Sequence, residues 1–109
     1  MPRAPSKFVV RREGGDVILS WEPLQGDGKV NYFVEIETEL DSCMVPVGEK
    51  TWWICSIKQL VQQFTSGEQQ PETLRFAVVA ANEAGHGPRS SWSESRTFSE
   101  FRRLALREE

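Results

Sequence analysis

A chain of 109 residues has room for one hydrophobic core, because two cores would each be too small to bury an interior. Its 39% hydrophobic and 27% charged residues are typical of a globular domain, which excludes disordered and collagenous classes, and no apolar run approaches the roughly 18 residues of a membrane span. The net charge of -3 lacks the basic excess that nucleic-acid binding requires. We therefore expect no nucleic acid among the partners and no membrane insertion by this domain.

Seven short segments show the alternation of apolar and polar residues that is typical of strands with one face on a core. Pro46 assigns the fourth segment to a sheet edge, because proline cannot donate to a hydrogen-bond ladder. The glycine-rich residues 85–88 are expected to end the sixth segment as a turn. Short strands at this spacing predict an all-β sandwich. The predicted strands are residues 8–11, 16–21, 31–38, 44–47, 51–55, 74–81 and 92–98.

Residues 57–66 depart from the strand pattern, because their apolar side chains recur at the spacing of one helix face. Ser56, followed three residues later by a glutamine, forms a capping box, and Gly67 can end the helix in the left-handed conformation. We expect a short helix between the fifth and sixth strands. It either closes one end of the sandwich or presents Gln62 and Gln63 to a partner. The apolar positions are Ile57, Leu60, Val61 and Phe64.

Three motifs in chain order resemble the fibronectin type III family. They read Val-Ile-Leu-Ser-Trp-Glu-Pro at 17–23, Tyr-Phe-Val-Glu-Ile at 32–36 and Leu-Arg-Phe-Ala-Val-Val-Ala-Ala-Asn-Glu-Ala-Gly-His-Gly at 74–87. The resemblance runs from about residue 5 to residue 98. It implies a seven-stranded immunoglobulin-like sandwich over residues 1–98, followed by a linker or tail over 99–109. The expected core residues are Trp21, Tyr32, Val34, Phe76 and Val78.

The chain departs from the family pattern at two places. Leu74 stands where the family has a tyrosine whose hydroxyl braces the turn between the fifth and sixth strands. The same connection, short in the family, here contains the predicted helix. Burial of Leu60 and Phe64 from that helix is expected to replace the missing brace.

Residues 89–94, Arg-Ser-Ser-Trp-Ser-Glu, resemble a degenerate Trp-Ser-X-Trp-Ser signature of class I cytokine receptors, which are built on the same fold. Arg89 replaces the first tryptophan. In those receptors the tryptophans stack on arginines of the preceding strand, where only Arg75 is available here. The other interpretation is that Trp92 covers one side of the last strand through a cation–π contact with Arg75 or Arg89.

Side chains for catalysis or metal binding are sparse. The single histidine, His86, lies in a glycine-rich turn, and a nucleophile needs an adjacent base. Glu35 and Glu37 share a strand face, which we interpret as a solvated face rather than an acid–base pair. One histidine and two widely spaced cysteines are too few ligands for a metal site. We expect no enzyme activity, no cofactor and no metal.

Cys43 and Cys55 can form at most one bridge, whereas small secreted domains usually carry more, and the chain has no Asn-X-Ser/Thr sequon. Both facts favour a cytoplasmic location, with an extracellular part of a receptor as the alternative. We expect Cys43 to be exposed in the connection before the fourth strand and Cys55 to be buried. Both thiols are then expected to be free.

These observations predict a non-enzymatic module for protein–protein interaction or spacing in a larger multidomain protein, monomeric as an isolated domain. Trp52 and Trp53 are adjacent, so one of them must point outward if they lie on a strand, and a large exposed aromatic side chain indicates an interface. The alternative is a ligand-binding extracellular module of a cytokine-receptor-like or adhesion receptor. The candidate protein-binding residues are Phe33, Trp52, Trp53 and Trp92.

Overall fold

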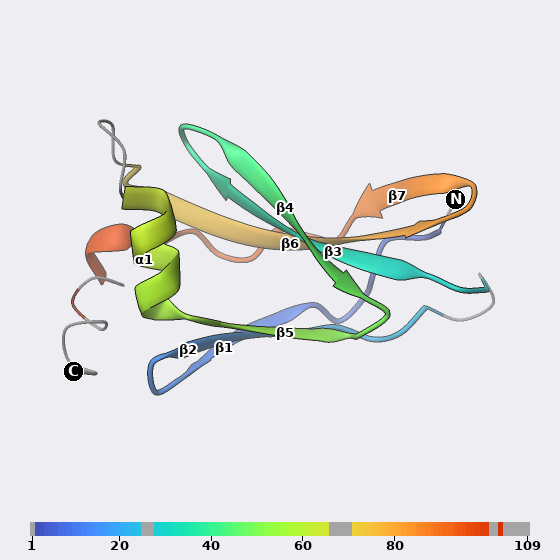
Figure 1. The fold of residues 1–109 in the computed structure, drawn as a ribbon, viewed down its shortest axis with the longest axis horizontal. Coiled ribbons are helices and arrows are strands. Elements are labelled where there is room, and N and C mark those ends of the chain that lie inside the picture. The colour runs from blue at the N-terminus through green and yellow to red at the C-terminus, as the bar shows by residue number, and fades with distance from the viewer. Residues whose placement is uncertain (1, 25–27, 66–70, 101–102, 104–109) are drawn as a thin grey trace.

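The computed structural model of the protein describes residues 2–24, 28–65, 71–100 and 103. Two antiparallel sheets pack face to face as a sandwich, and a helix stands across one end of it (Figure 1). The first sheet has the order β1 (Val9–Glu13), β2 (Asp16–Ser20), β5 (Trp52–Ser56). The second has the order β4 (Ser42–Gly48), β3 (Asn31–Thr38), β6 (Thr73–Asn82), β7 (Gly85–Arg89), with β8 (Arg96–Thr97) also paired to β6. The predicted fold class is confirmed.

The core lies between the sheets and is built by alternate residues of β2, β3 and β6. Trp21 is only 5% exposed, and its ring centroid lies 5.6 Å from that of Tyr32. The Tyr32 hydroxyl accepts a hydrogen bond from the Leu24 N–H at 3.0 Å, so this buried phenol is not left unsatisfied. All five expected core residues lie in the cluster, namely Trp21, Tyr32, Val34, Phe76 and Val78.

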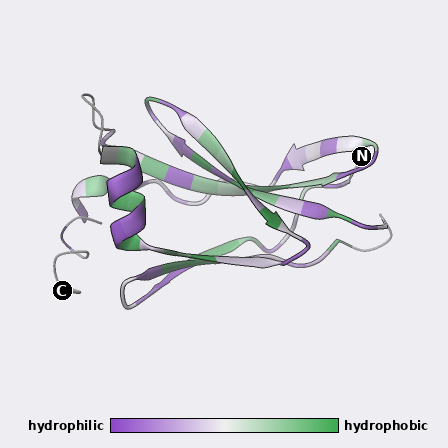
Figure 2. Ribbon diagram, viewed as in Figure 1, coloured by the Kyte–Doolittle hydropathy of each residue, from purple (hydrophilic) through white to green (hydrophobic). Residues whose placement is uncertain are grey.

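The helix α1 (Ile57–Thr65) follows β5 directly, between the fifth and sixth strands as predicted. The Ser56 hydroxyl caps it by accepting the Gln59 N–H at 3.1 Å. Leu60 is fully buried, and the Phe64 ring packs at a tilt against Phe98 with 6.0 Å between ring centroids. Figure 2 shows both hydrophilic and hydrophobic residues along α1. The apolar residues of α1 lie in or against the core, so the helix closes one end of the sandwich with its apolar face. Ser66 and Gly67 lie outside the described residues.

The last predicted strand, residues 92–98, was placed wrongly. Residues 85–88, expected as a turn, lie within β7, and only Arg96 and Thr97 of the later stretch pair as β8. Between them, the Ser90 and Ser93 hydroxyls accept the backbone N–H groups of Val78 and Phe76 at 3.0 and 2.8 Å. Serine side chains thus take the place of backbone carbonyls and interrupt the strand.

Strand limits elsewhere differ by a few residues. The first strand begins at Val9 and extends to Glu13, and β4 begins at Ser42. β4 lies at a sheet edge, which confirms the prediction made from Pro46. Most of the predicted tail, residues 99–109, lies outside the described residues, so the boundary at 98 stays a prediction.

Candidate protein-binding surface

Trp92 lies on the outer face of the second sheet, in a stack of charged side chains that we call the Trp92 ladder. The Arg75 and Arg89 guanidinium carbons lie 4.0 and 4.8 Å from the Trp92 ring centroid. Arg75 donates to Glu37 at 2.7 Å, and Arg89 donates to both carboxylate oxygens of Glu35 at 2.9 and 3.1 Å. Each arginine is therefore fixed by a carboxylate while it contacts the ring.

The Trp92 ladder corrects the expectation of a solvated glutamate face. Glu35 is only 8% exposed, and its hydrogen bond to Arg89 raises the pKa of that guanidinium. Ala77 and Val79 point outward from β6 between the charged residues, yet both are buried. The ladder therefore covers apolar residues of the sheet, and Trp92 is engaged within the domain.

Phe33 and Trp53 are also engaged with the domain itself. The Phe33 ring is half-buried on the outer face of the second sheet and lies 5.2 Å from the His86 ring, centroid to centroid. Trp53 points inward from β5 and packs against the core. Both side chains are half-buried and contact other residues of the domain.

Trp52 points the other way, onto the outer face of the first sheet, and is 47% exposed. Ile54, two residues along β5, is 48% exposed and lies opposite Ile18 of β2. Val9 of β1 is exposed on the same face. We call these four residues, Val9, Ile18, Trp52 and Ile54, the outer patch. The Lys50 ammonium lies 4.9 Å from the Trp52 ring centroid, and among the described residues no carboxylate forms an ion pair with it.

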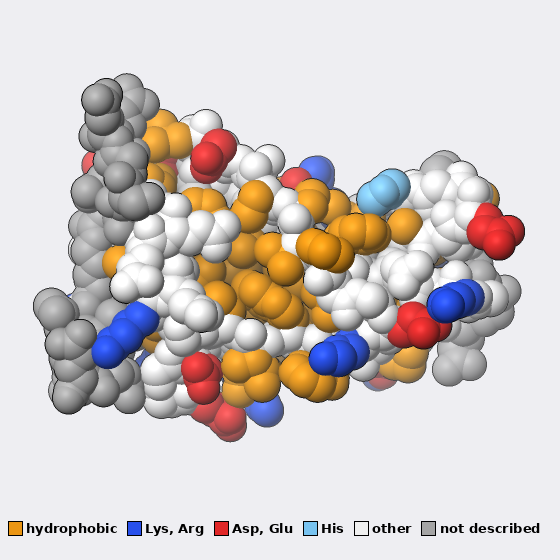
Figure 3. Space-filling view, viewed as in Figure 1, with side chains coloured by type: hydrophobic (Ala, Val, Ile, Leu, Met, Phe, Trp, Pro, Cys, Tyr) orange, Lys and Arg blue, Asp and Glu red, His pale blue; other side chains and the backbone are white. Residues whose placement is uncertain are grey.

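The outer patch continues around the edge of β5 into an apolar strip between β4 and β5. Figure 3 shows hydrophobic side chains gathered across the middle of this side of the molecule. They are half-buried residues that pack against the core yet are not covered by another strand. We call this strip the β4–β5 seam; it consists of Cys43, Val45, Val47, Trp53 and Cys55.

The expectation that Cys43 is exposed in a loop is wrong. It lies within β4, opposite Ile36, and is half-buried like Cys55. Both thiols are free, and burial raises the pKa of each, with the carboxylates of Asp41 and Asp16 adding to the effect at Cys43 and Cys55 respectively. Protonated, half-buried thiols are poor nucleophiles, so both cysteines should react slowly.

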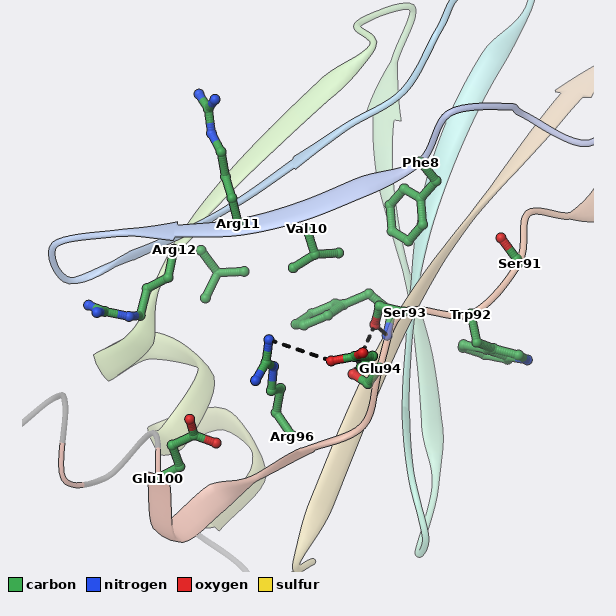
Figure 4. A pocket seen from close by; sticks show the side chains of 12 residues that line it. Phe8, Val10, Arg11, Arg12, Ser91, Trp92, Ser93, Glu94, Arg96 and Glu100 are labelled. Atoms are coloured by element: carbon green, nitrogen blue, oxygen red, sulfur yellow. Dashed lines mark hydrogen bonds and ion pairs between the residues drawn. The ribbon is translucent and has the colours of Figure 1, made fainter.

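A groove of about 350 Å³ lies on the opposite side of the sandwich, between β1 and residues 91–96. Figure 4 shows Val10 and Arg12 on the side of β1 that faces this segment, with Arg96 across from them. Its floor is apolar, and its rim carries charges of both signs, including Glu94 and Glu100. The signal for it in the sequence is Arg12, an arginine at a core-facing position of a strand. The lining offers room for a side chain but no convergent polar set.

Chemistry beyond binding has little support in the described residues. They contain no group of three or more His, Cys, Asp and Glu side chains placed to hold a metal ion. The His86 ring packs against Phe33, and among the described residues it forms no hydrogen bond to a nucleophile. Within the same described ranges, no helix is long and apolar enough to cross a membrane.

Comparison with known proteins shows what this architecture is similar to. No protein-family model and no curated protein sequence matches the chain. A chicken CNTN1 fragment with domains FN1–FN3 matches 89% of the chain with a TM-score of 0.63 and 16% identity, and the chain covers 32% of that fragment. The fn3 domain of human contactin 1 matches with a TM-score of 0.61 and 17% identity, over 89% of this chain and 77% of that structure's chain. The FN5 domain of Drosophila Lar matches with a TM-score of 0.59 and 14% identity, over 89% of this chain and 96% of that domain. Likeness at these identities shows the fold alone.

Proposed function

We propose that this chain, which has a fibronectin type III-like fold, is a non-enzymatic protein-interaction or spacer module of a larger multidomain protein. Its structural neighbours include domains within multidomain fragments, such as titin A168–A170 and the twitchin kinase region of C. elegans. The observation that carries the proposal is the outer patch, where Trp52 and Ile54 are about half exposed on one face. Exposed apolar groups gathered on one surface mark a site for a protein partner.

Trp52 is the proposed anchor of the binding surface. Tryptophan supplies a large apolar area and an indole N–H at a small entropic cost, and it is enriched among the residues that dominate binding energy. Of the four aromatic candidates, the other three are held by His86, the core or the Trp92 ladder. Lys50 beside Trp52 adds a positive charge at the rim, which favours a partner with an acidic residue there.

We also propose that the chain is not an enzyme and uses no cofactor, and the surroundings of its two thiols support this. Each half-buried thiol contacts a glutamine, Cys43 near Gln63 and Cys55 near Gln59, and burial together with a nearby carboxylate raises the pKa of both thiols. Neither arrangement can activate a nucleophile.

The test is binding by matched variants of the domain in its full-length parent. Proteins captured by the wild type are purified and titrated against the wild type, Trp52→Ala and Met44→Ala, in which an exposed apolar residue of β4 is removed instead. We expect Trp52→Ala to weaken binding at least tenfold and Met44→Ala to leave it unchanged. Equal affinities for all three proteins would contradict the proposed surface.

A cytoplasmic location is proposed, supported by two free thiols on different sheets. The second candidate, an extracellular receptor module, is favoured by the Trp92 ladder and by the hydroxyls of Ser90 and Ser93 that bind β6. Lysis of cells that express the full-length protein directly into denaturant with an alkylating reagent, followed by mass spectrometry, distinguishes the two. Alkylated Cys43 and Cys55 are expected in the cytoplasm, and oxidised cysteines would favour the receptor.

A further inference from the structure

The strands at sheet edges differ in whether a further strand can add to them. An exposed edge offers unpaired N–H and C=O groups, and proteins block it with proline, inward-pointing charge or a covering segment. β1 has an inward-pointing Arg12. β7 contains Pro88, and the N-terminal segment covers it so closely that a side chain at Gly87 would clash with the Pro2 carbonyl. Both of these edges are protected.

The β4 edge is blocked by Pro46. The Thr38 N–H donates to the Asp41 carbonyl at 2.8 Å. This bond shows which residues of β4 direct their backbone groups toward β3, since the pairing continues from it along both strands. Because hydrogen-bonded and non-hydrogen-bonded pairs alternate in an antiparallel ladder, Met44 and Pro46 have their backbone groups directed to the open side. Proline has no N–H there, so a strand that added to β4 would lose a donor at this position.

The β5 edge is open by the same reasoning. At its two ends, the Trp21 N–H bonds the Thr51 carbonyl at 3.1 Å and the Ile57 N–H bonds the Gly15 carbonyl at 2.8 Å. The odd-numbered residues of this stretch therefore bond β2. The even-numbered ones direct their N–H and C=O groups to the open side.

Two of those even-numbered residues, Trp52 and Ile54, also form most of the outer patch with their side chains. β5, with the sequence Trp-Trp-Ile-Cys-Ser, contains no charge and no proline. β5 therefore lacks the blocking devices that protect the edges of β1, β4 and β7. Free backbone groups and exposed apolar side chains coincide at the same two residues.

We propose that β5 pairs antiparallel with β5 of a second copy of this chain, about a two-fold axis at Trp53. This register places the edge-directed groups of Trp52 opposite those of Ile54 of the second copy, and the reverse. The two three-stranded sheets become one continuous sheet. The same side chains then meet on the outer face, Trp52 against Ile54.

A second copy fits this edge because β5 is complementary to itself. No like charges meet across the two-fold axis, since the strand is uncharged. The inward-facing residues of the two β5 strands lie on one side of the joined sheet, so the two β4–β5 seams face each other and shield apolar side chains such as Val45 and Val47. A short strand contact buries little area, so the dimer is weak and the domain is monomeric when dilute.

Sedimentation velocity over a concentration series tests the proposal. The wild type is expected to shift from monomer to dimer as concentration rises into the upper micromolar range. Ile54→Lys is expected to stay monomeric, because it removes the apolar contact with Trp52 and brings a second ammonium close to Lys50, which already lies over that ring. Met44→Lys, the matched change on the blocked β4 edge, is expected to dimerise like the wild type. Circular dichroism and thermal melts establish that each variant is folded.

A cross-link tests the register and does not depend on the destabilising variants. In a Cys43→Ser background, Thr51→Cys places a thiol opposite Cys55 of the second copy, in a non-hydrogen-bonded pair with Cα atoms about 4.5 Å apart. Mild oxidation should give a disulfide dimer with this bond, and Thr97→Cys in the same background should give none. A wild type that stays monomeric at millimolar concentration, or equal dimerisation by Ile54→Lys and the wild type, would overturn the proposal.

Discussion

The outer faces of the two sheets each carry a tryptophan, and the two tryptophans differ in the side chains that surround them. Trp92 lies between two arginines, each held by a glutamate of β3, and the stack covers Ala77 and Val79. Trp52 has one lysine above its ring and exposed aliphatic neighbours. A surface tryptophan fixed by charged neighbours stabilises its own domain, whereas one without them is available to another molecule.

The largest effect on stability is expected in the core, which lies between the two sheets and serves as the reference for both outer faces. Trp21→Ala removes a buried ring that packs on Phe8 and Tyr32. We expect a loss of about 3–5 kcal/mol in the free energy of unfolding, enough to unfold a domain of ordinary stability. Urea denaturation followed by tryptophan fluorescence measures it. A nearly unchanged midpoint would refute the described core.

The segment that carries Trp92 depends on serine hydroxyls. Ser90→Ala leaves the buried Val78 N–H without its acceptor, which should cost about 1–3 kcal/mol. Ser95→Ala is the matched control, because Ser95 is exposed and should change stability by less than about 0.5 kcal/mol. If the two variants melt alike, the serine does not replace a strand carbonyl.

The direct comparison of the faces is a pair of tryptophan substitutions. Trp92→Ala removes two cation–π contacts and should cost about 1–2 kcal/mol. Trp52→Ala should change the free energy of unfolding by less than about 0.5 kcal/mol, since its side chain is half exposed. Chemical denaturation of both variants at low and high salt makes the measurement. Equal losses would remove the distinction drawn between the faces.

The smallest effect concerns Glu39, a further carboxylate that binds the second sheet. Its oxygens accept the Thr73 and Glu72 N–H groups at 3.0 Å, and these bonds lower the pKa of the carboxyl. The stabilisation is therefore present at neutral pH, above the pKa in the unfolded chain, and is lost as pH falls through the lowered pKa of the folded state.

Glu39→Gln should accordingly be slightly less stable than the wild type at pH 7, with the difference vanishing in acid. Glu49→Gln is the control, since Glu49 is exposed in the turn after β4. Thermal melts from pH 2 to pH 7 make the comparison. A difference that grows toward acid would have the wrong sign.

Local periodicity predicted much of the fold. The alternation over β2, β3 and β6 and the apolar stripe of α1 are properties of neighbouring residues, so each could be identified without knowing the rest of the chain. The last strand could not be predicted in this way. Its interruption depends on Ser90 and Ser93 finding backbone donors 12 and 17 residues away on β6.

The candidate site was predicted less well for the same reason. The sequence singled out four aromatic residues but did not separate Trp52 from Trp92. The arginines that fix Trp92 bond to glutamates 38 and 54 residues away in the chain, and no local pattern records such pairs. The Glu35–Glu37 face was misread because those partners come from other strands.

By itself, the sequence determined that the chain forms a sandwich with a capped helix, that Pro46 lies on an edge, and that one of Trp52 and Trp53 points outward. These properties follow from the geometry of single strands and helix turns. The tertiary structure decided which tryptophan has partners and which edge is open. β5 is an edge strand because of the sheet order β1-β2-β5, and Trp52 is exposed because no other described segment covers it, so both depend on how residues far apart in sequence are arranged.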